Sequence, residues 1–181
     1  MPEHQHGTVI VTGASRGIGA SISRELARAG LNVACLSRSG EMPDAGTLDE
    51  ADYKRLAALR CDITDSASVV AAFEAAPNLF GQSIVGLVNN AGIHLQGPSA
   101  TFPIADFERV MQTNASSVLL ASQVAYPLLR EAGAALIVNI GSFYDKLGVR
   151  GNAAYCASKA AVGAISRCLA VEWARDGIQV I

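Results

Sequence analysis

The sequence has no cluster of one charge, no long hydrophobic run and no targeting segment. Its 14 basic and 16 acidic side chains give a net charge of −2 without a basic run, so we expect neither nucleic acid nor a membrane as a partner. Polar residues and Pro127 interrupt the apolar stretch 116–129, so no membrane span is predicted. Residues 1–7 lack the basic and apolar segments of a secretory signal.

Cysteine and histidine are scarce and scattered. The four cysteines have no metal-ligand spacing and three of them lie in apolar runs, while the three histidines are too far apart to form a ligand set. We therefore predict no metal site, and reduced core thiols of a cytoplasmic protein in place of a disulfide framework. The residues concerned are Cys35, Cys61, Cys156 and Cys168, with His4, His6 and His94.

Strand-like and helix-like patterns alternate along the whole chain. The expected strands are 8–11, 32–36, 56–60, 84–88, 135–140 and 178–181, and the expected helices are 17–29, 65–76, 106–131 and 153–175. Residues 39–52 are predicted to form an exposed loop, and Pro127 to kink the third helix. Apolar strands joined by helices favour a doubly wound parallel α/β sheet covered on both faces, and 181 residues with 50% hydrophobic content fit one domain.

A glycine-rich turn, residues 12–19, connects the first strand to the first helix. Glycines there allow a tight turn and a close approach of the backbone to a ligand. The N–H groups and dipole of the following helix favour a phosphate. The spacing GxxxGxG therefore indicates a dinucleotide site, although such a turn alone is equally typical of an α/β protein without a ligand.

Three residues form a second candidate site, one after the fifth strand and two at the start of the last helix. Ser142 follows that strand, and Tyr155 and Lys159 lie one turn apart on one face of the last helix. An ammonium beside a phenol stabilises the phenolate, which suits the pair to proton transfer. Ser142 would hydrogen-bond the substrate oxygen. On its own, a YxxxK pattern is more often a packed tyrosine and a solvated lysine.

Taken together, these motifs resemble the short-chain dehydrogenase/reductase family along essentially the whole chain, including members similar to β-ketoacyl-[acyl-carrier-protein] reductases. The matching pieces are residues 12–19, Asp62, residues 89–92, Asn114, Ser142 and residues 155–159. The resemblance implies a Rossmann-type three-layer α/β/α fold, a nicotinamide cofactor, and hydride transfer between that cofactor and a carbonyl or alcohol carbon.

The resemblance also implies the roles of the catalytic residues. Tyr155 would be the general acid/base, and Lys159 would stabilise its phenolate and hold the nicotinamide ribose. Ser142 would orient the substrate, and Asn114 would link Lys159 to solvent through a water molecule. Asn114 has an alternative role, because an asparagine inside a helix also bonds nearby backbone groups and bends the helix.

The second strand ends in Ser37, Arg38 and Ser39, without the carboxylate that accepts from the ribose 2′-OH of NAD. Arg38 is suited to bind a 2′-phosphate, and Arg16 supplies a second cation nearby, so we expect NADP(H) to be preferred over NAD(H). The alternative is that Arg16 and Arg38 are solvated surface arginines. Asp62 would bond the adenine or, alternatively, cap a turn, and Asn89 is expected to support the sheet. The predicted cofactor residues are Gly13, Ser15, Arg16, Gly17, Ile18, Gly19, Arg38, Asp62, Asn90, Ala91, Gly92, Tyr155 and Lys159.

We therefore expect an NADP(H)-dependent reductase of ketones, with 3-oxoacyl compounds among the candidates. Leu95, Phe143 and Leu147 indicate a partly apolar substrate pocket. The alternatives are a non-catalytic nucleotide-binding subunit or fragment, and an isomerase or dehydratase of the same family.

The last helix is apolar nearly all round, which favours a homodimer or homotetramer formed through the two long helices. Family members continue beyond the sixth strand. We therefore expect 1–181 to be a single domain truncated within that strand, without the C-terminal strand and the substrate-loop region.

Overall fold

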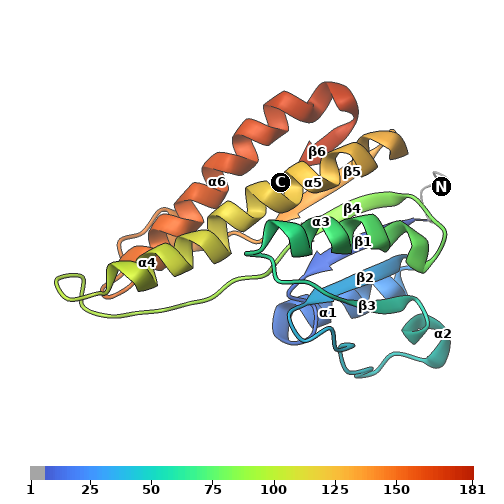
Figure 1. Ribbon diagram of the computed structural model, residues 1–181, viewed down its shortest axis with the longest axis horizontal. Helices are drawn as coiled ribbons and strands as arrows, with labels where there is room; N and C mark the ends of the chain where they lie inside the picture. Colours follow the sequence, from blue (N-terminus) through green and yellow to red (C-terminus); the bar gives the residue numbers. More distant parts are fainter. Residues whose placement is uncertain (1–6) are drawn as a thin grey trace.

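The computed structural model describes residues 7–181, so His4 and His6 lie outside the described part. Its centre is a six-stranded parallel sheet with the order β3-β2-β1-β4-β5-β6 (Figure 1). The strands are β1 (Thr8–Thr12), β2 (Asn32–Ser37), β3 (Leu56–Arg60), β4 (Ile84–Asn89), β5 (Ala135–Asn139) and β6 (Ile178–Val180). The helices are α1 (Gly17–Arg28), α2 (Glu50–Tyr53), α3 (Ser66–Ala75), α4 (Ile104–Met111), α5 (Ser117–Ala132) and α6 (Ala153–Trp173). This confirms the predicted Rossmann-type class.

The strand order places a switch point between β1 and β4. β1 pairs in parallel with β2 on one side and with β4 on the other, so Val11 lies opposite both Cys35 and Val88. The segments that follow β1 and β4 leave the sheet at the same carboxyl edge. Ligands of doubly wound folds bind at this position.

Alternating side chains of the strands build a separate apolar core on each face of the sheet. Val9 and Val11 point toward α1, whereas Ile10 points to the opposite face, which α3, α5 and α6 cover. On the α1 side, however, Leu136 of β5 is 38% exposed. The expected cover on both faces therefore holds over β1 and β2 but not over β5 within residues 7–181.

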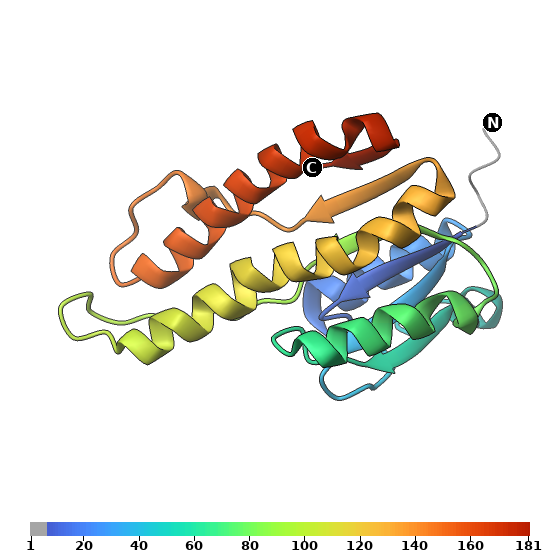
Figure 2. The same cartoon turned by 45° about the horizontal axis from the view of Figure 1, so that its top comes forward.

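The helix predicted over 106–131 departs from the prediction in its middle. The run begins at Ile104 and contains a π-helical turn over Gln112–Ser116, which separates α4 from α5. The irregular hydrogen bonding therefore lies at the turn that carries Asn114, and Pro127 lies within α5. α4 and the first turns of α6 project beyond the sheet, together with the loops that follow β4 and β5 (Figure 2).

Smaller differences concern loop and helix ends. The predicted loop over 39–52 ends early, because Asp49 caps the short helix α2 by accepting a hydrogen bond from the Asp52 N–H. Asp65 caps α3 as expected, and α6 finishes in a 3-10 turn over Ala174–Asp176. All four cysteines are free thiols. Among residues 7–181, no helix has the length and apolar character that crossing a membrane requires.

Asn89 supports the sheet from inside the core, as the sequence predicted. Its buried amide donates to Asn139 Oδ1 of β5 at 2.8 Å and to Ser122 Oγ of α5 at 3.2 Å. The amide of Asn139 in turn donates to Ser166 Oγ of α6 at 2.8 Å. This network joins two strands to both long helices without leaving these amide groups unpaired.

We predict that Asn89→Ala lowers the free energy of unfolding by about 1–3 kcal/mol, because Asn139 Oδ1 would remain buried without its donor. Urea denaturation measures the loss. Asn32→Ala is the matched control. Asn32 is half-buried at the start of β2, and its side-chain amide bonds only the side chain of Gln82. Equal losses in the two variants would contradict the role assigned to the network.

Candidate active site

A cleft of about 1250 Å³ lies at the carboxyl edge of the sheet, where the segments after β1, β2, β3 and β4 meet. Most of the predicted cofactor residues line it, namely Gly13, Ser15, Arg16, Gly17, Ile18, Arg38, Asp62, Asn90, Ala91 and Gly92. Gly19, Tyr155 and Lys159 are not among the lining residues. Ten of the predicted cofactor residues therefore lie together at the switch point.

The end of β4 clamps the glycine turn in place. Thr12 Oγ1 accepts hydrogen bonds from the backbone N–H groups of Asn90 at 3.0 Å and Ala91 at 3.1 Å. The amide of Asn90 donates back to the carbonyl oxygens of Thr12 at 3.0 Å and Gly13 at 3.2 Å. These four bonds join the two loops on either side of the switch point.

Two glycines of the turn are required by the close packing of its backbone. Gly13 has a φ of +66°, and a Cβ there would lie 2.9 Å from the Cα of Ala91. A Cβ on Gly19 would overlap the carbonyl oxygen of Gly13. Gly19 therefore shapes the cleft from behind, by letting α1 approach the turn.

The first turn of α1 faces the cleft with free N–H groups. α1 begins at Gly17, and Arg16 at its N-cap position makes no side-chain capping bond. Unpaired N–H groups and the positive end of the helix dipole favour an anion. The glycine turn and this helix start therefore fit a dinucleotide pyrophosphate.

The end of the cleft beside β2 and β3 carries both signs of charge. Arg16 and Arg38 are exposed there, as the sequence predicted, but Glu41 also lines the cleft. Sequence reasoning missed Glu41 because it searched for a carboxylate directly at the end of β2. A search along the following loop would have found it.

Asp62 has a local partner within the cleft. Its Oδ1 accepts from the Thr64 hydroxyl at 2.7 Å and from the Thr64 N–H at 2.9 Å. These bonds, with a smaller contribution from the Arg38 charge, lower the pKa of Asp62. The alternative of a turn-capping carboxylate is therefore realised, and the contact with adenine stays a prediction.

Tyr155 and Lys159 lie on the first turns of α6. Lys159 is 7% exposed, and its Nζ donates to the carbonyl oxygen of Ile140, just after β5, at 2.6 Å. The same Nζ lies 5.7 Å from the centre of the Tyr155 ring. Burial lowers the pKa of Lys159, because the ammonium has lost most of its hydration. The two side chains therefore lie close together on one face of α6, and the effect of the Lys159 ammonium on the Tyr155 hydroxyl stays a prediction.

Ser142 and Asn114 lie on two other elements, at the start of the 3-10 turn after β5 and in the π-helical turn between α4 and α5. Ser142 Oγ accepts from the N–H of Tyr144 at 3.2 Å and caps the 3-10 turn Phe143–Asp145. Asn114 holds both backbone groups of Ile93, with its Oδ1 at 2.8 Å and its Nδ2 at 2.9 Å. Its Nδ2 also donates to Ser158 Oγ at 3.1 Å.

The bonds of Asn114 show the structural role that the sequence left open. Its amide bonds backbone groups from within the π-helical turn. Its place in a proton relay stays a prediction. Leu95, from the expected apolar pocket, lines the cleft, whereas Phe143 and Leu147 are 69% and 53% exposed.

Two residues near Tyr155, His94 and Asn152, were not singled out individually by the sequence. The ring of His94, in the loop after β4, lies 4.5 Å from the Tyr155 ring, and its Nε2 meets Asn152 Oδ1. As a single residue, His94 was considered as a metal ligand and not as a neighbour of Tyr155. Its position in the loop after the Asn-Asn-Ala-Gly stretch was the available signal.

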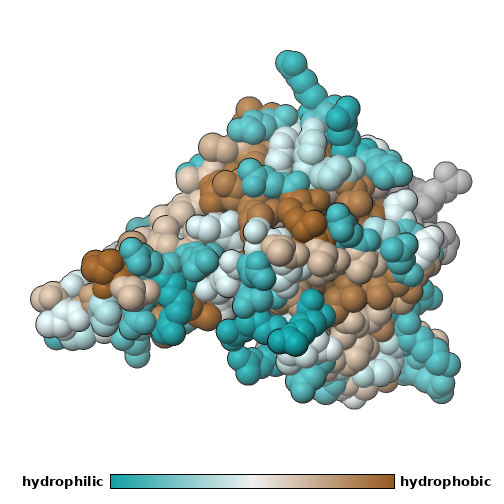
Figure 3. Space-filling view, in the orientation of Figure 1, coloured by the Kyte–Doolittle hydropathy of each residue, from teal (hydrophilic) through white to brown (hydrophobic). Residues whose placement is uncertain are grey.

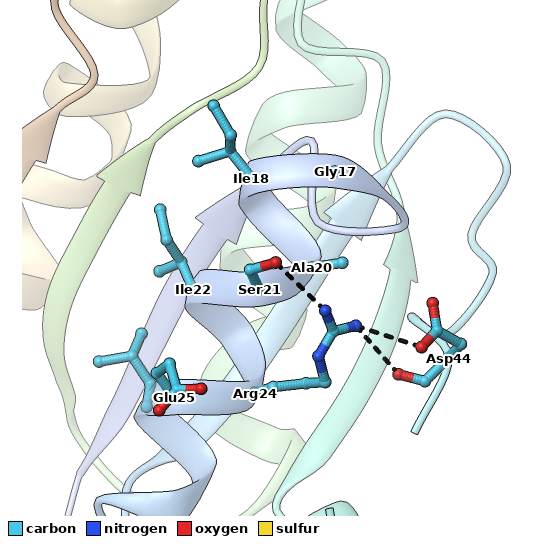
Figure 4. A pocket seen from close by; sticks show the side chains of 9 residues that line it. Gly17, Ile18, Ala20, Ser21, Ile22, Arg24, Glu25 and Asp44 are labelled. Atoms are coloured by element: carbon cyan, nitrogen blue, oxygen red, sulfur yellow. Dashed lines mark hydrogen bonds and ion pairs between the residues drawn. The ribbon is translucent and has the colours of Figure 1, made fainter. Parts of the chain in front are cut away.

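A second pocket, of about 740 Å³, lies on the outer side of α1 (Figure 4). Ile18 and Ile22 form its apolar side. Arg24 crosses it and bonds Ser21 at 3.2 Å and Asp44 at 3.3 Å. This bonding ties the loop after β2 to α1 and pairs Arg24 with Asp44, while Glu25, which also lines the pocket, pairs with Arg28.

The chain belongs to the short-chain dehydrogenase/reductase family. The family model for short chain dehydrogenases matches residues 7–181. Members of this family are oxidoreductases that use nicotinamide cofactors.

A chloroplastic tropinone reductase homologue from Arabidopsis thaliana is 33% identical and is matched over 96% of this chain and 54% of its own length. The D-threitol dehydrogenase of Mycolicibacterium smegmatis is 34% identical over 94% of this chain and 66% of its own length. The chain therefore spans 54% and 66% of these two relatives. A short chain dehydrogenase from Mycobacterium smegmatis has a similar structure, with a TM-score of 0.86, 27% identity, and coverage of 97% of this chain and 74% of that one.

We predict that Lys159→Met raises the free energy of unfolding at pH 7, because the folded protein would no longer bury an ammonium ion. The folded-state pKa of Lys159 lies below its ordinary value of 10.5. At a pH between the folded-state pKa and the ordinary pKa, wild type therefore takes up a proton on unfolding. Its free energy of unfolding rises with pH across that range. The advantage of the variant should narrow as the pH approaches 10.5.

Urea denaturation at a series of pH values measures this difference. Lys54→Met is the control, because Lys54 is 72% exposed and pairs with Glu50 on α2. A Lys159→Met variant whose stability relative to wild type does not change with pH would contradict the assignment.

Proposed function

We propose that the protein is an NADP(H)-dependent oxidoreductase that interconverts a ketone and a secondary alcohol, with Tyr155 as general acid/base. The observation that carries the proposal is the Tyr155–Lys159 pair beside the glycine-turn cleft. A proton-transfer group and a cradle for a dinucleotide then share one edge of the sheet. An isomerase or dehydratase of the same family is the alternative, and a redox product distinguishes it.

The residues of the cleft fit the cofactor of the family. The uncapped first turn of α1 would hold the pyrophosphate, and Ala91 and Gly92, which line the cleft, would lie against the adjoining ribose. Arg16 and Arg38 would contact a 2′-phosphate. When bound, the nicotinamide supplies or accepts the hydride at the substrate carbon.

The protein's own groups would handle the proton. In ketone reduction the Tyr155 hydroxyl donates its proton to the substrate oxygen, and the resulting phenolate lies beside the Lys159 ammonium. Ser142 would donate a hydrogen bond to the same substrate oxygen. A proton from solvent then restores the Tyr155 hydroxyl, and alcohol oxidation follows the reverse order.

We propose a secondary alcohol or ketone as the substrate class. The relatives named above include a D-threitol dehydrogenase and a tropinone reductase homologue, which points to a panel of polyols and cyclic ketones. The exposed side chains of Phe143 and Leu147 offer apolar contacts near the expected reacting centre.

We also propose a homo-oligomer formed through the long helices. Ala160, Ala164, Cys168 and Val171 are exposed at helical spacing along α6, and Val171 is 80% exposed. Apolar surface gathers over α5 and α6 in Figure 3. Burial of this stripe against a second copy would remove it from water.

We predict that the protein binds NADPH more tightly than NADH, and that Arg38→Gln weakens NADPH binding by about 10- to 100-fold, the loss expected for one charge-assisted contact. Glu41→Gln should strengthen NADPH binding, because it removes a negative charge from the same end of the cleft. Fluorescence titration measures all four affinities.

Arg60→Gln is the matched control for the change of charge, since exposed Arg60 ends β3 outside the cleft. Equal affinities of wild type for the two cofactors would overturn the preference for NADP(H). No binding of either cofactor by the folded protein would overturn the cleft as a dinucleotide site.

We predict that Tyr155→Phe retains NADPH binding within about twofold and lowers kcat by at least about 100-fold, since it removes the proton donor but keeps the ring. NADPH oxidation with the ketones of the panel, and NADP⁺ reduction with D-threitol, measure turnover. Retained turnover in Tyr155→Phe would contradict the role of the hydroxyl. NADPH binding without turnover of any substrate by wild type would favour the non-catalytic alternative.

A further inference from the structure

We propose that His94 is a positioning residue for Tyr155, fixed by a hydrogen bond to the buried amide of Asn152. The inference rests on the proposed function, in which Tyr155 transfers the proton. It concerns a residue from the loop after β4 and a residue from the loop after β5. Neither belongs to the group of Asn114, Ser142, Tyr155 and Lys159.

The orientation of the Asn152 amide determines how it holds His94. Asn152 is 6% exposed, and its Nδ2 donates to the carbonyl oxygen of Arg150 at 2.9 Å. Its Oδ1 is therefore the atom that faces His94 Nε2. Because an amide oxygen only accepts, Nε2 must carry a hydrogen and donate it. The tautomer and the ring plane of His94 are fixed in this way.

The fixed imidazole packs directly on the proposed general acid/base. The rings of His94 and Tyr155 have centres 4.5 Å apart and planes inclined by 39°. Tyr144 meets Tyr155 edge to face, with ring centres 5.7 Å apart and planes inclined by 86°. Two aromatic neighbours from different loops therefore restrict the rotation of the Tyr155 side chain.

A backbone bond holds the two loops together beside this contact. Gly97 N–H donates to the carbonyl oxygen of Gly151 at 2.9 Å, three residues after His94 and one before Asn152. Asn152 immediately precedes α6 but makes no side-chain capping bond to it. The Asn152 amide is therefore engaged with Arg150 and His94, and not with the start of the helix.

This arrangement explains how His94 would act on the reaction without moving the proton itself. A general acid must keep its hydroxyl within hydrogen-bond reach of the substrate oxygen, and small displacements of a reacting group lower the rate steeply. Loss of the His94 ring opens space on one side of Tyr155. We therefore expect kcat to fall while cofactor binding, which uses other residues, stays unchanged.

The test compares three replacements of His94 in steady-state kinetics with NADPH and the best ketone of the panel. His94→Ala removes both contacts and should lower kcat by about 10- to 100-fold. His94→Phe keeps a ring on Tyr155 without the donor, and His94→Gln keeps a donor without the ring. Each of these two variants should have a kcat between those of His94→Ala and wild type. The KM for NADPH should stay within about twofold of wild type in all three.

A second pair of variants tests whether Asn152 acts through His94. Asn152→Ala alone should lower kcat, but it should add no further loss in the His94→Phe background, where its partner is already gone. Gln96→Ala is the matched control, since exposed Gln96 lies two residues from His94 in the same loop. Its kcat should equal that of wild type.

The outcomes separate the inference from the proposed function. If Tyr155→Phe is inactive while His94→Ala keeps full kcat, the positioning role is wrong and the function stands. Additive losses for Asn152→Ala and His94→Phe would also overturn it. If wild type turns over nothing, proton NMR of the folded protein still decides. Nuclear Overhauser contacts between the His94 and Tyr155 rings, weakened in Asn152→Ala, support the proposal, and their absence overturns it.

Discussion

The reciprocal hydrogen bonds between Thr12 and Asn90 are the constraint on which the site depends. β1 and β4 lie side by side in the sheet, but their chains diverge at the carboxyl edge, and a divergent pair of loops has no backbone ladder to fix it. Thr12 Oγ1 and the Asn90 amide supply that connection. They can do so only because Gly13 and Gly19 carry no Cβ, since a side chain at either position would meet the backbone of Ala91 or of Gly13. One local network thus holds the glycine turn, places the start of α1 at the cleft and requires glycine at positions 13 and 19.

Burial of Lys159 sets the energetics on the other side of the cleft. An ammonium ion that is 7% exposed, with one carbonyl oxygen as its hydrogen-bond partner, costs stability in the folded state. The fold offsets this cost elsewhere, through fully buried apolar side chains such as Phe73, Ile10 and Leu87 on one face of the sheet. A charged group kept at such a cost, beside a tyrosine and at the edge where ligands of this fold class bind, supports the role proposed for Lys159.

The sequence predicted the order of elements well because buried parallel strands are short apolar runs with little ambiguity. The positions of Gly13, Arg38, Tyr155 and Lys159 followed from strand ends and helical spacing. The π-helical turn at Gln112–Ser116 could not be predicted, because the spacing of apolar residues in this segment does not indicate one extra residue in a helical turn. It forms where Asn114 bonds both backbone groups of Ile93, a contact across 21 residues. Glu41 was missed for a related reason, since the path of a loop is fixed by its partners and not by a repeating pattern.

His94 shows the same limit of sequence-based prediction beside Tyr155. An isolated histidine in a loop has many uses, and the sequence could not tell which atoms would meet its ring. The structure answers this through a chain of fixed orientations, in which the Arg150 carbonyl fixes the Asn152 amide and the amide fixes the His94 ring against Tyr155. Arg150 and Asn152 belong to the loop after β5 and His94 to the loop after β4, and these two loops flank the tyrosine. Precise placement of Tyr155, the proposed proton donor, on the first turn of α6 therefore depends on contacts between these loops as well as on the helix that carries it.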